Sequence, residues 1–349
     1  MPRLSPRLIR HAYNANPLLK LLLPVCRDLE SARNELRWLQ DHAVGLAARS
    51  RNAPQTWQTR LQVMVRQRAT GKPLQYILGT EYFGDLEIVC RPGVLIPRQD
   101  TAASVAHLAH LLQSNDCLPN RLRVLDLCTG SGCIPLLFEH LFSQSGDPPE
   151  LQLLGVDVSK RCLDLAEENK ARCQARHAEF AQADILATGD VSPQGQHLPA
   201  LLKSRVSPHW DILISNPPYI SSRDFRKTTA RSVRKFEPKL ALVPPAGVSE
   251  IPDDGDLFYP RLLDVADDVH SKVVLFEVAD LSQALRVASM AKKKGSWDGV
   301  EIWKDEPGAK DDSMVQLEQL VSGLKVLGRG NGRSVVCWRD QGARWLGRT

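Results

Sequence analysis

The chain has 349 residues, of which 43% are hydrophobic and 24% are charged, and its formal net charge is +5. This length exceeds what one ordinary domain needs, and the composition allows sizeable cores to be buried. The mild positive charge permits an acidic or RNA-bearing partner without arguing for one. No apolar run approaches the length of a membrane span, so we expect no membrane partner. The eight cysteines include no Cys-x-x-Cys pair, and we interpret them as reduced thiols with no metal site.

The first 27 residues are basic and contain no acidic residue before Asp28. Their cations are Arg3, Arg7, Arg10, Lys20 and Arg27. An acid-poor, arginine-bearing start is typical of a mitochondrial transit peptide. The stretch from Leu18 to Pro24 is apolar, however, and a basic first helix of the folded domain explains residues 1–27 equally well. The two interpretations are compatible, and both stay open.

Residues 28–75 are predicted to form a small helical domain, because apolar residues recur at roughly helical spacing between 29 and 70. Residues 76–100 differ in character. Apolar residues alternate there with other types, and glycines stand at 79, 84 and 93. This pattern predicts a β-hairpin that links two domains.

From residue 101 to residue 349 the pattern alternates between short apolar strands and amphipathic helices. The expected strands are Val124–Leu127, Leu151–Val156, a strand that ends at 183–185, Asp211–Ser215, Val273–Val278, Val300–Lys304 and Ser334–Trp338. Such an order predicts an α/β domain, with helices on both faces of a mostly parallel sheet and a final antiparallel pair. Residues 188–208, which carry proline, glycine and glutamine, are expected to be an inserted surface loop.

A glycine turn, Gly130-Ser-Gly132, separates the strand that ends at Leu127 from the helix that follows. Glycines allow the backbone to approach a ligand closely. Asp157 ends the next strand, where a carboxylate can accept from both hydroxyls of a ribose. The third glycine of the dinucleotide fingerprint is missing, which argues against NAD and favours an adenosyl ligand without phosphates.

The stretch Asn216-Pro-Pro-Tyr219 follows the buried strand Asp211–Ser215 directly. Two consecutive prolines cannot continue a sheet, so a stiff loop is expected at the carboxyl end of the strand, where open α/β sheets bind ligands. The Asn216 side chain and the Asn216 and Pro217 carbonyls offer acceptors for an NH₂ group, and the Tyr219 ring offers a flat platform. Taken alone, the stretch is equally well explained as a turn.

Several motifs together are far more specific than each alone. Those in Asp126-Leu-Cys-Thr-Gly-Ser-Gly132, Gly155-Val-Asp157, Ala183-Asp184 and Asn216-Pro-Pro-Tyr-Ile220 resemble the class I S-adenosylmethionine-dependent methyltransferases. The stretches Leu95-Ile-Pro-Arg98, Gly71–Gly79 and Phe236-Glu-Pro238 resemble the HemK/PrmC family, the protein-(glutamine-N5) methyltransferases of peptide chain release factors. The basic start and two insertions, at Ser143 and Thr188, look like the eukaryotic, mitochondrial branch of that family. The resemblance extends over nearly the whole chain from about Leu29.

The resemblance implies a class I, Rossmann-like domain of seven strands, the last two in hairpin order, preceded by a small helical domain that recognises the substrate. The implied cofactor is S-adenosyl-L-methionine. The implied partner is a class 1 peptide chain release factor, whose Gly-Gly-Gln glutamine is methylated on its amide nitrogen, and nucleic acid is not required. The implied location is mitochondrial, or otherwise cytoplasmic.

The resemblance also implies roles for particular residues. The cofactor-binding residues would be Asp126, Cys128, Thr129, Gly130, Ser131, Gly132, Asp157, Asp184, Ile185 and Asn216. The catalytic residues would be Asn216, Pro217 and Tyr219, and these three would bind the substrate together with Pro218 and Arg98. The chain departs from the family where Gln99-Asp-Thr-Ala102 replaces the usual Pro-Glu-Thr-Glu, and where Cys128 replaces a commoner glycine.

Two other functions remain open on the sequence. An Asn-Pro-Pro-Tyr loop also serves adenine-N6 methyltransferases of DNA or RNA, in which Tyr219 would stack on a flipped base. No separate target-recognition domain is evident, but the basic stretch from Arg223 to Arg234 keeps this alternative open. A non-catalytic adaptor that uses the sheet only for binding is the third interpretation.

Overall fold

The computed structural model describes residues 4–49, 56–115, 117–146, 148–187, 191–192, 195–205, 209–245, 255–309 and 323–348. The chain divides into two compact units. The first, which we call the helical unit, comprises Met1–Thr80, Cys90–Pro92 and Ala230–Glu237. The second, the sheet unit, comprises Glu81–Val89, Gly93–Thr229 and Pro238–Thr349.

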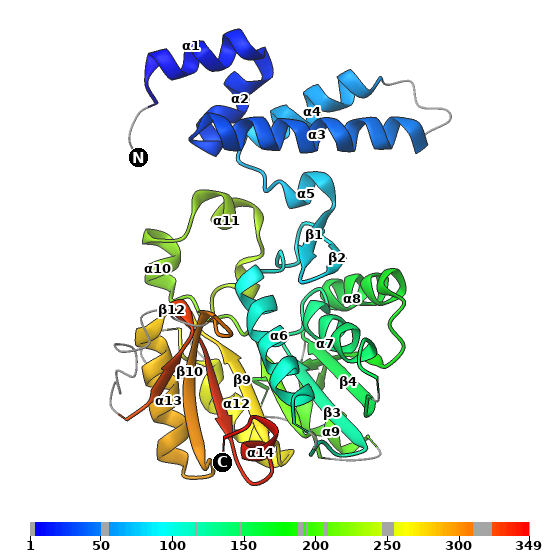
Figure 1. The fold of residues 1–349 in the computed structure, drawn as a ribbon, viewed down its shortest axis with the longest axis vertical. Coiled ribbons are helices and arrows are strands. Elements are labelled where there is room, and N and C mark those ends of the chain that lie inside the picture. Colours follow the sequence, from blue (N-terminus) through cyan, green and yellow to red (C-terminus); the bar gives the residue numbers. More distant parts are fainter. Residues whose placement is uncertain are drawn as a thin grey trace. The chain divides into compact units, whose positions relative to one another are not determined.

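The helical unit consists of helices (Figure 1), and all of them except α11 contribute residues to one apolar cluster. Its helices are α1 (Pro6–Ala15), α2 (Pro17–Cys26), α3 (Leu29–Arg49), α4 (Trp57–Ala69), α5 (Gln75–Leu78) and α11 (Arg231–Phe236). Ser5 and Asn16 cap α1 and α2, and a proline in the first turn fits each start because a backbone N–H is not needed there. The Arg68 guanidinium donates to both oxygens of Glu35, at 2.6 and 2.8 Å, and so ties α4 to α3.

The basic N-terminal stretch is part of this folded unit. Leu19, Leu22 and Leu23 of α2 are buried in the same apolar cluster as Leu36 and Leu39 of α3. Because the apolar run from Leu18 to Pro24 contributes to the core, the interpretation of this stretch as a helical start of the folded domain agrees with the structure, although two helices, α1 and α2, form there and not one. A targeting role is compatible with this fold and stays a prediction.

The sheet unit is organised around a ten-stranded sheet. The seven main strands are β3 (Arg121–Leu127), β4 (Glu150–Asp157), β5 (Ala178–Asp184), β8 (Ile212–Ser215), β9 (Val273–Glu277), β10 (Gly299–Glu306) and β12 (Arg329–Trp338). They follow the order β10-β12-β9-β8-β3-β4-β5. The strands from β9 to β5 are parallel, and β12 lies antiparallel to both β9 and β10. This is the predicted parallel sheet with a terminal antiparallel pair.

Three short strands make the sheet wider than the predicted seven. Strand β11 (Lys325–Leu327) extends one edge, and β7 (Gly195–His197) followed by β6 (Val191–Ser192) extends the other. The hairpin expected in residues 76–100 is present as the separate two-stranded sheet of β1 (Thr80–Phe83) and β2 (Leu86–Val89).

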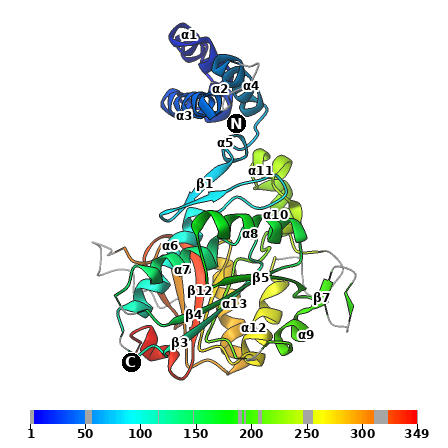
Figure 2. The same cartoon turned by 90° about the vertical axis from the view of Figure 1, so that its right-hand side faces the viewer.

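Neighbouring residues of a strand point to opposite sides of the sheet. In this sheet both sides are apolar, so helices cover both faces. Val124, Leu153 and Ile212 belong to one apolar cluster, and the residues that follow them in sequence, such as Leu125 and Leu213, belong to the other. Helices α6 (Gln99–Gln113) and α7 (Cys133–Ser143) pack on the first face, and α12 (Phe258–Asp268) and α13 (Leu281–Lys294) pack on the second (Figure 2). Near-continuous apolar strands are expected where both faces are buried.

Two segments differ from their sequence-based interpretation. Residues 188–208 were predicted to be a loop, but their described part contains helix α9 (Leu198–Lys203). Leu198, Leu201 and Leu202 recur at helical spacing and are buried in the core, and this burial outweighs the surrounding proline and glycine. The basic stretch 223–234 contributes to two short helices, α10 (Ser222–Lys227) and α11. The centre of the predicted partly helical 304–325 segment lies outside the described residues.

In the part of the chain that the structure covers, no helix combines the length and apolarity needed to cross a bilayer.

The close packing of β4 on its neighbours gives a test of the fold. A Cβ atom on Gly155 would lie 2.6 Å from Phe180 Cδ1 and 2.6 Å from Thr129 Oγ1. We expect Gly155→Ala to lower the free energy of unfolding by about 1–3 kcal/mol, because the neighbours must move to make room. The measurement is chemical denaturation. The control is Gly146→Ala, since a Cβ there meets no atom within 4 Å. Equal stability of the two variants would contradict this packing.

Candidate active site

The carboxyl ends of five neighbouring parallel strands form one edge of the sheet. In sheet order, β9 ends at Glu277, β8 leads into Asn216, β3 leads into Cys128, β4 ends at Asp157 and β5 ends at Asp184. After β5 the chain crosses to the other side of β3, so β3 and β8 flank the topological switch point where open α/β sheets bind ligands.

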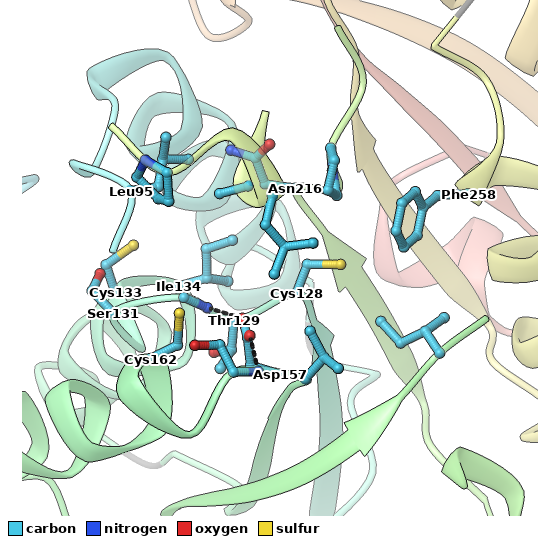
Figure 3. Close-up of a pocket in the computed structure, with 18 of the residues that line it drawn as sticks. Leu95, Cys128, Thr129, Ser131, Cys133, Ile134, Asp157, Cys162, Asn216 and Phe258 are labelled. Atoms are coloured by element: carbon cyan, nitrogen blue, oxygen red, sulfur yellow. Dashed lines mark hydrogen bonds between the residues drawn. The ribbon is translucent and has the colours of Figure 1, made fainter. Parts of the chain in front are cut away.

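A cavity of about 390 Å³ opens at this edge (Figure 3). The sequence-predicted residues that line it are Arg98, Cys128, Thr129, Gly130, Ser131, Asp157, Asp184, Ile185, Asn216 and Pro218. Asn216 and Asp157 approach the cavity from opposite sides (Figure 3). Segments far apart in the sequence therefore converge on one space, which is the arrangement expected of a ligand site.

The loop after β3 turns tightly around the base of the cavity. Thr129 N–H donates to the Val156 carbonyl at 3.0 Å, and Gly130 N–H donates to Asp157 Oδ2 at 2.9 Å. Gly130 has φ +56°, and a Cβ atom built on it would meet no atom within 4 Å. Since Gly130 lines the cavity, a side chain there would enter the space that a ligand needs.

Cys128 has φ +65°, in the left-handed region that favours glycine. This explains why glycine is commoner there in the family and implies a local cost of about 1–2 kcal/mol. Burial raises the pKa of the Cys128 thiol well above its ordinary value, and the nearby Asp157 and Asp126 carboxyl groups add to the shift. The thiol therefore stays protonated and does not act as a nucleophile.

Asp157 is held by two backbone donors. Its Oδ2 accepts from Gly130, and its Oδ1 accepts from Ser159 N–H at 2.9 Å. Burial raises the pKa of Asp157, and these backbone hydrogen bonds oppose the shift. Each carboxylate oxygen has a second lone pair, so the group can still accept from the two hydroxyls of a ribose. On the neighbouring strand, Asp184 Oδ1 accepts from Leu186 N–H at 2.9 Å, and Ile185 lines the cavity beside it. The residues present thus fit the adenosyl part of S-adenosylmethionine.

Asp126 does not line the cavity. It is fully buried in β3, where Thr129 Oγ1 donates to its Oδ2 at 2.6 Å. Its Oδ1 has no hydrogen-bond partner among the described residues. Burial raises the pKa of Asp126 to about 8, so the group is mostly a neutral acid at pH 7. Its visible role is to hold Thr129 at the start of the loop.

Three more predicted residues are absent from the described wall of the cavity: Gly132, Pro217 and Tyr219. Gly132 faces the protein interior, where a Cβ atom would lie 2.7 Å from Phe180 Cζ and 2.9 Å from Ala166 Cβ. Pro217 is buried. The Tyr219 hydroxyl donates to Glu277 Oε1 at 3.0 Å, so this ring is fixed to the core and is not available as a platform in the cavity. The motifs therefore place these residues in the right loops, but the structure does not bring them to the described wall of the cavity.

Two polar residues that the sequence analysis did not single out are connected to Asn216: Thr101, which also lines the cavity, and Glu277, which does not. Asn216 Nδ2 donates to Thr101 Oγ1 at 3.3 Å, and Thr101 Oγ1 donates to Glu277 Oε2. Both Thr101 and Glu277 are buried. The sequence did contain a signal for this pair: Glu277 lies in the apolar strand Val273–Val278, and a buried charge needs hydrogen-bond partners nearby.

The Asn-Pro-Pro-Tyr loop is anchored at its far end as well. Gln283 Nε2 donates to the Tyr219 carbonyl at 3.2 Å, and Ile220 N–H donates to the Leu242 carbonyl at 2.9 Å. Gly255 lies against the backbone of Tyr219, so that a Cβ atom on it would be 2.0 Å from the Tyr219 carbonyl oxygen. The loop that carries Asn216 is therefore rigid at both ends, as precise positioning of a reacting group requires.

A mostly parallel sheet with an antiparallel terminal pair, a glycine-bearing loop after β3 and an acceptor at the end of β4 define a class I S-adenosylmethionine-dependent methyltransferase. The chain is 37% identical over 247 residues to a Saccharomyces cerevisiae protein named mitochondrial MRF1 N(5)-glutamine methyltransferase MTQ1, covering 70% of this chain and 68% of that protein. It is 32% identical over 326 residues to a Schizosaccharomyces pombe protein named probable MRF1 mitochondrial N(5)-glutamine methyltransferase mtq1, covering 89% and 95%.

The chain belongs to the release factor glutamine methyltransferase family, and the predicted resemblance to HemK/PrmC proteins is confirmed. A bacterial protein named release factor glutamine methyltransferase, from Thermodesulfovibrio yellowstonii, is 29% identical over 71% of this chain and 77% of its own length. Among solved structures, the N-terminal domain of human METTL16 is similar with a TM-score of 0.45 and 17% identity, over 79% of this chain and 81% of that one. No protein-family model matches the chain.

The glycine loop gives a test of the cofactor site. We expect Gly130→Val to lower the affinity for S-adenosylmethionine by about 10-fold or more, because the side chain enters the cavity. Isothermal titration calorimetry measures this affinity. The matched control is Gly295→Val, at a glycine that also has positive φ (+73°) and open space around its Cβ but lies at the end of α13. Unchanged affinity in the Gly130 variant would place the cofactor elsewhere.

Proposed function

We infer that this protein transfers a methyl group from S-adenosylmethionine to the side-chain amide nitrogen of the glutamine in the Gly-Gly-Gln motif of a class 1 peptide chain release factor. The observation that carries this proposal is the Asn216 carboxamide, which lines the cavity on a loop anchored at both ends. Membership of the release factor glutamine methyltransferase family supports the same substrate.

Positioning is the main task of the residues around the cavity. An amide nitrogen is a poor nucleophile, because its lone pair is delocalised into the carbonyl group. S-adenosylmethionine supplies a methyl group on a positively charged sulfur, which is already a strong electrophile. The Asn216 side-chain oxygen accepts a hydrogen from the substrate amide, orients its nitrogen and favours the positive charge that develops there. No strong base is needed, since the methylated amide loses its extra proton readily to water.

The second acceptor predicted from the sequence was the Pro217 carbonyl. Pro217 is not in the described wall of the cavity, so the proposal rests on Asn216 alone. A single well-placed acceptor still discriminates between glutamine and glutamate. A glutamine offers NH₂ hydrogens to the Asn216 oxygen, whereas a carboxylate would face it with lone pairs.

The adenine-N6 alternative has less support. It requires a flat platform for a flipped base, and the ring predicted to supply it, that of Tyr219, has its hydroxyl on the buried Glu277 and is not part of the described cavity wall. The adaptor alternative also has less support, because Asp157, Gly130 and Asn216 all keep positions that fit a cofactor and a substrate.

We also propose that the helical unit contacts the release factor outside its Gly-Gly-Gln motif. A single glutamine on a loop presents little binding surface, so specificity needs further contacts. The helical unit exposes several large apolar side chains that could supply them: Tyr13, Leu21, Trp38, Val44 and Val63.

A mitochondrial location is a further part of the proposal. It is supported by the acid-free first 27 residues and by the names of the two yeast relatives, both of which are described as mitochondrial. Because Leu19, Leu22 and Leu23 are core residues, removal of all 27 residues would expose the apolar cluster of the helical unit. We therefore propose that α2 is retained in the mature protein.

The substrate proposal is tested by incubating the protein and S-adenosylmethionine with a recombinant class 1 release factor and locating the methyl group by mass spectrometry. We expect one methyl group, on the Gly-Gly-Gln glutamine. Asn216→Ala should reduce single-turnover transfer by roughly 10²-fold or more, as loss of one preorganised polar group commonly does, while cofactor affinity falls much less.

Different outcomes separate the explanations. A methyl group on another residue, or transfer to nucleic acid with none to the factor, would reject the substrate proposal. Glutamine methylation by the wild type with near-normal transfer by Asn216→Ala would keep the substrate and reject the acceptor role of Asn216.

The targeting proposal predicts that residues 1–27 carry a reporter protein into mitochondria. The matched control is the same segment with Arg7→Glu and Arg10→Glu, which lie in α1 and lower the formal side-chain charge of the segment from +5 to +1. Fluorescence microscopy with a mitochondrial marker gives the location. A reporter that stays cytosolic with the unaltered segment would contradict the proposal.

A further inference from the structure

A chain of hydrogen bonds runs from the cavity into the core of the sheet unit. It begins at Asn216 Nδ2, which donates to Thr101 Oγ1 at 3.3 Å. Thr101 Oγ1 donates to Glu277 Oε2, and the Tyr219 hydroxyl donates to Glu277 Oε1 at 3.0 Å. Thr101 comes from the first turn of α6, Asn216 and Tyr219 from the loop after β8, and Glu277 from the end of β9. Three separate elements therefore meet behind one side chain of the proposed site.

Counting protons along this chain fixes the orientation of the Asn216 carboxamide. A threonine hydroxyl has one proton, and Thr101 gives it to Glu277. Toward Asn216 the Thr101 oxygen can then only accept, so the NH₂ end of the carboxamide must face it. The reversed carboxamide would bring two oxygens together with no proton between them. Hence Oδ1, to which no described residue donates, is the Asn216 atom left for a ligand.

The inner end of the chain is the buried carboxyl group of Glu277, which accepts from both Thr101 and Tyr219. Glu277 is only 4% exposed. Burial raises the pKa of Glu277 above its ordinary value, and the hydrogen bonds from Thr101 and Tyr219 and the charge of Arg333 limit that shift. An ionised carboxylate can only accept, which agrees with two hydroxyl groups aimed at its two oxygens.

We propose that Thr101, fixed by Glu277, is a positioning residue that holds the Asn216 carboxamide with its oxygen toward the substrate amide. This inference rests on the proposed function and adds two residues to it. Because Thr101 donates to Glu277, its oxygen can only accept from Asn216, and the Asn216 oxygen is left to accept from an NH₂ group in the cavity. Free rotation of the carboxamide would instead present its own NH₂ group to the substrate for part of the time.

The test compares Thr101→Val, which keeps the shape but removes the hydroxyl, with Thr101→Ser, which keeps the hydroxyl. With a class 1 release factor as substrate, we expect Thr101→Val to lower kcat by about 10-fold or more. The KM for the factor, and the affinity for S-adenosylmethionine measured by calorimetry, should stay within about 3-fold of the wild type. Thr101→Ser should restore most of the rate.

A control on the same helix separates positioning from packing. Ser104 lies one turn further along α6, is buried, and forms a hydroxyl pair with Ser334 at 3.0 Å. Ser104→Ala removes a comparable buried hydroxyl whose partner is Ser334 and not Asn216, so it should change thermal stability without changing kcat. Should Thr101→Val fail to fold, Glu277→Gln is the second variant. Its NH₂ group can donate to Thr101, which frees the Thr101 proton to turn the Asn216 carboxamide round, and kcat should fall to a similar extent.

The outcomes are distinct. Wild-type kcat in Thr101→Val, or in Glu277→Gln, would overturn the positioning role while leaving the proposed function intact. An equal loss in Thr101→Ser would also overturn it, because it would show that keeping the hydroxyl does not preserve the rate and that the packing of the whole side chain matters instead. A wild-type protein that fails to methylate the factor would instead reject the proposed function itself.

Discussion

The alignment of five parallel strand ends is the constraint on which the rest of the site depends. Backbone pairing fixes Leu127 beside both Val156 and Ser215, and Ser215 beside Phe276. Because this register is held by ladders buried on both faces, the residues that follow each strand have almost no freedom to shift along the edge. Loops that are far apart in the sequence thus meet within reach of one small ligand, with the acceptor for a ribose on one side and the acceptor for an amide on the other.

The polar groups beneath the cavity follow from the same constraint. A carboxyl group at the end of a buried strand loses its hydration and must find donors inside the protein. The Asp157 carboxylate accepts from two backbone N–H groups, and the Glu277 carboxylate accepts from two side-chain hydroxyls. A third carboxyl group, that of Asp126 within β3, is mostly neutral because burial raises its pKa to about 8. Such a preorganised environment suits a reaction in which positioning matters more than acid–base chemistry.

The sequence predicted the main strands in their order along the chain, the glycine loop, and Asn216 at the carboxyl end of a strand, where the structure has it line the cavity. Each of these rests on a local pattern: apolar runs, glycines directly after a strand, and prolines that end a strand. It could not predict that Tyr219 points into the core, since the direction of this side chain depends on its hydrogen bond to Glu277, which is distant in the chain. The same limit applies to α9, which becomes a helix because its leucines join the core. Local composition alone suggested a loop there.

The central claim is that the cavity presents a fixed hydrogen-bond acceptor to an NH₂ group. It is tested most directly by offering the wild-type protein a release factor in which the Gly-Gly-Gln glutamine is replaced by glutamate. The account predicts at least about 10²-fold slower methyl transfer, because the carboxylate faces the Asn216 oxygen without a hydrogen to donate. Formation of a glutamate methyl ester at a rate close to that of glutamine methylation, detected by mass spectrometry under mildly acidic conditions, would contradict it.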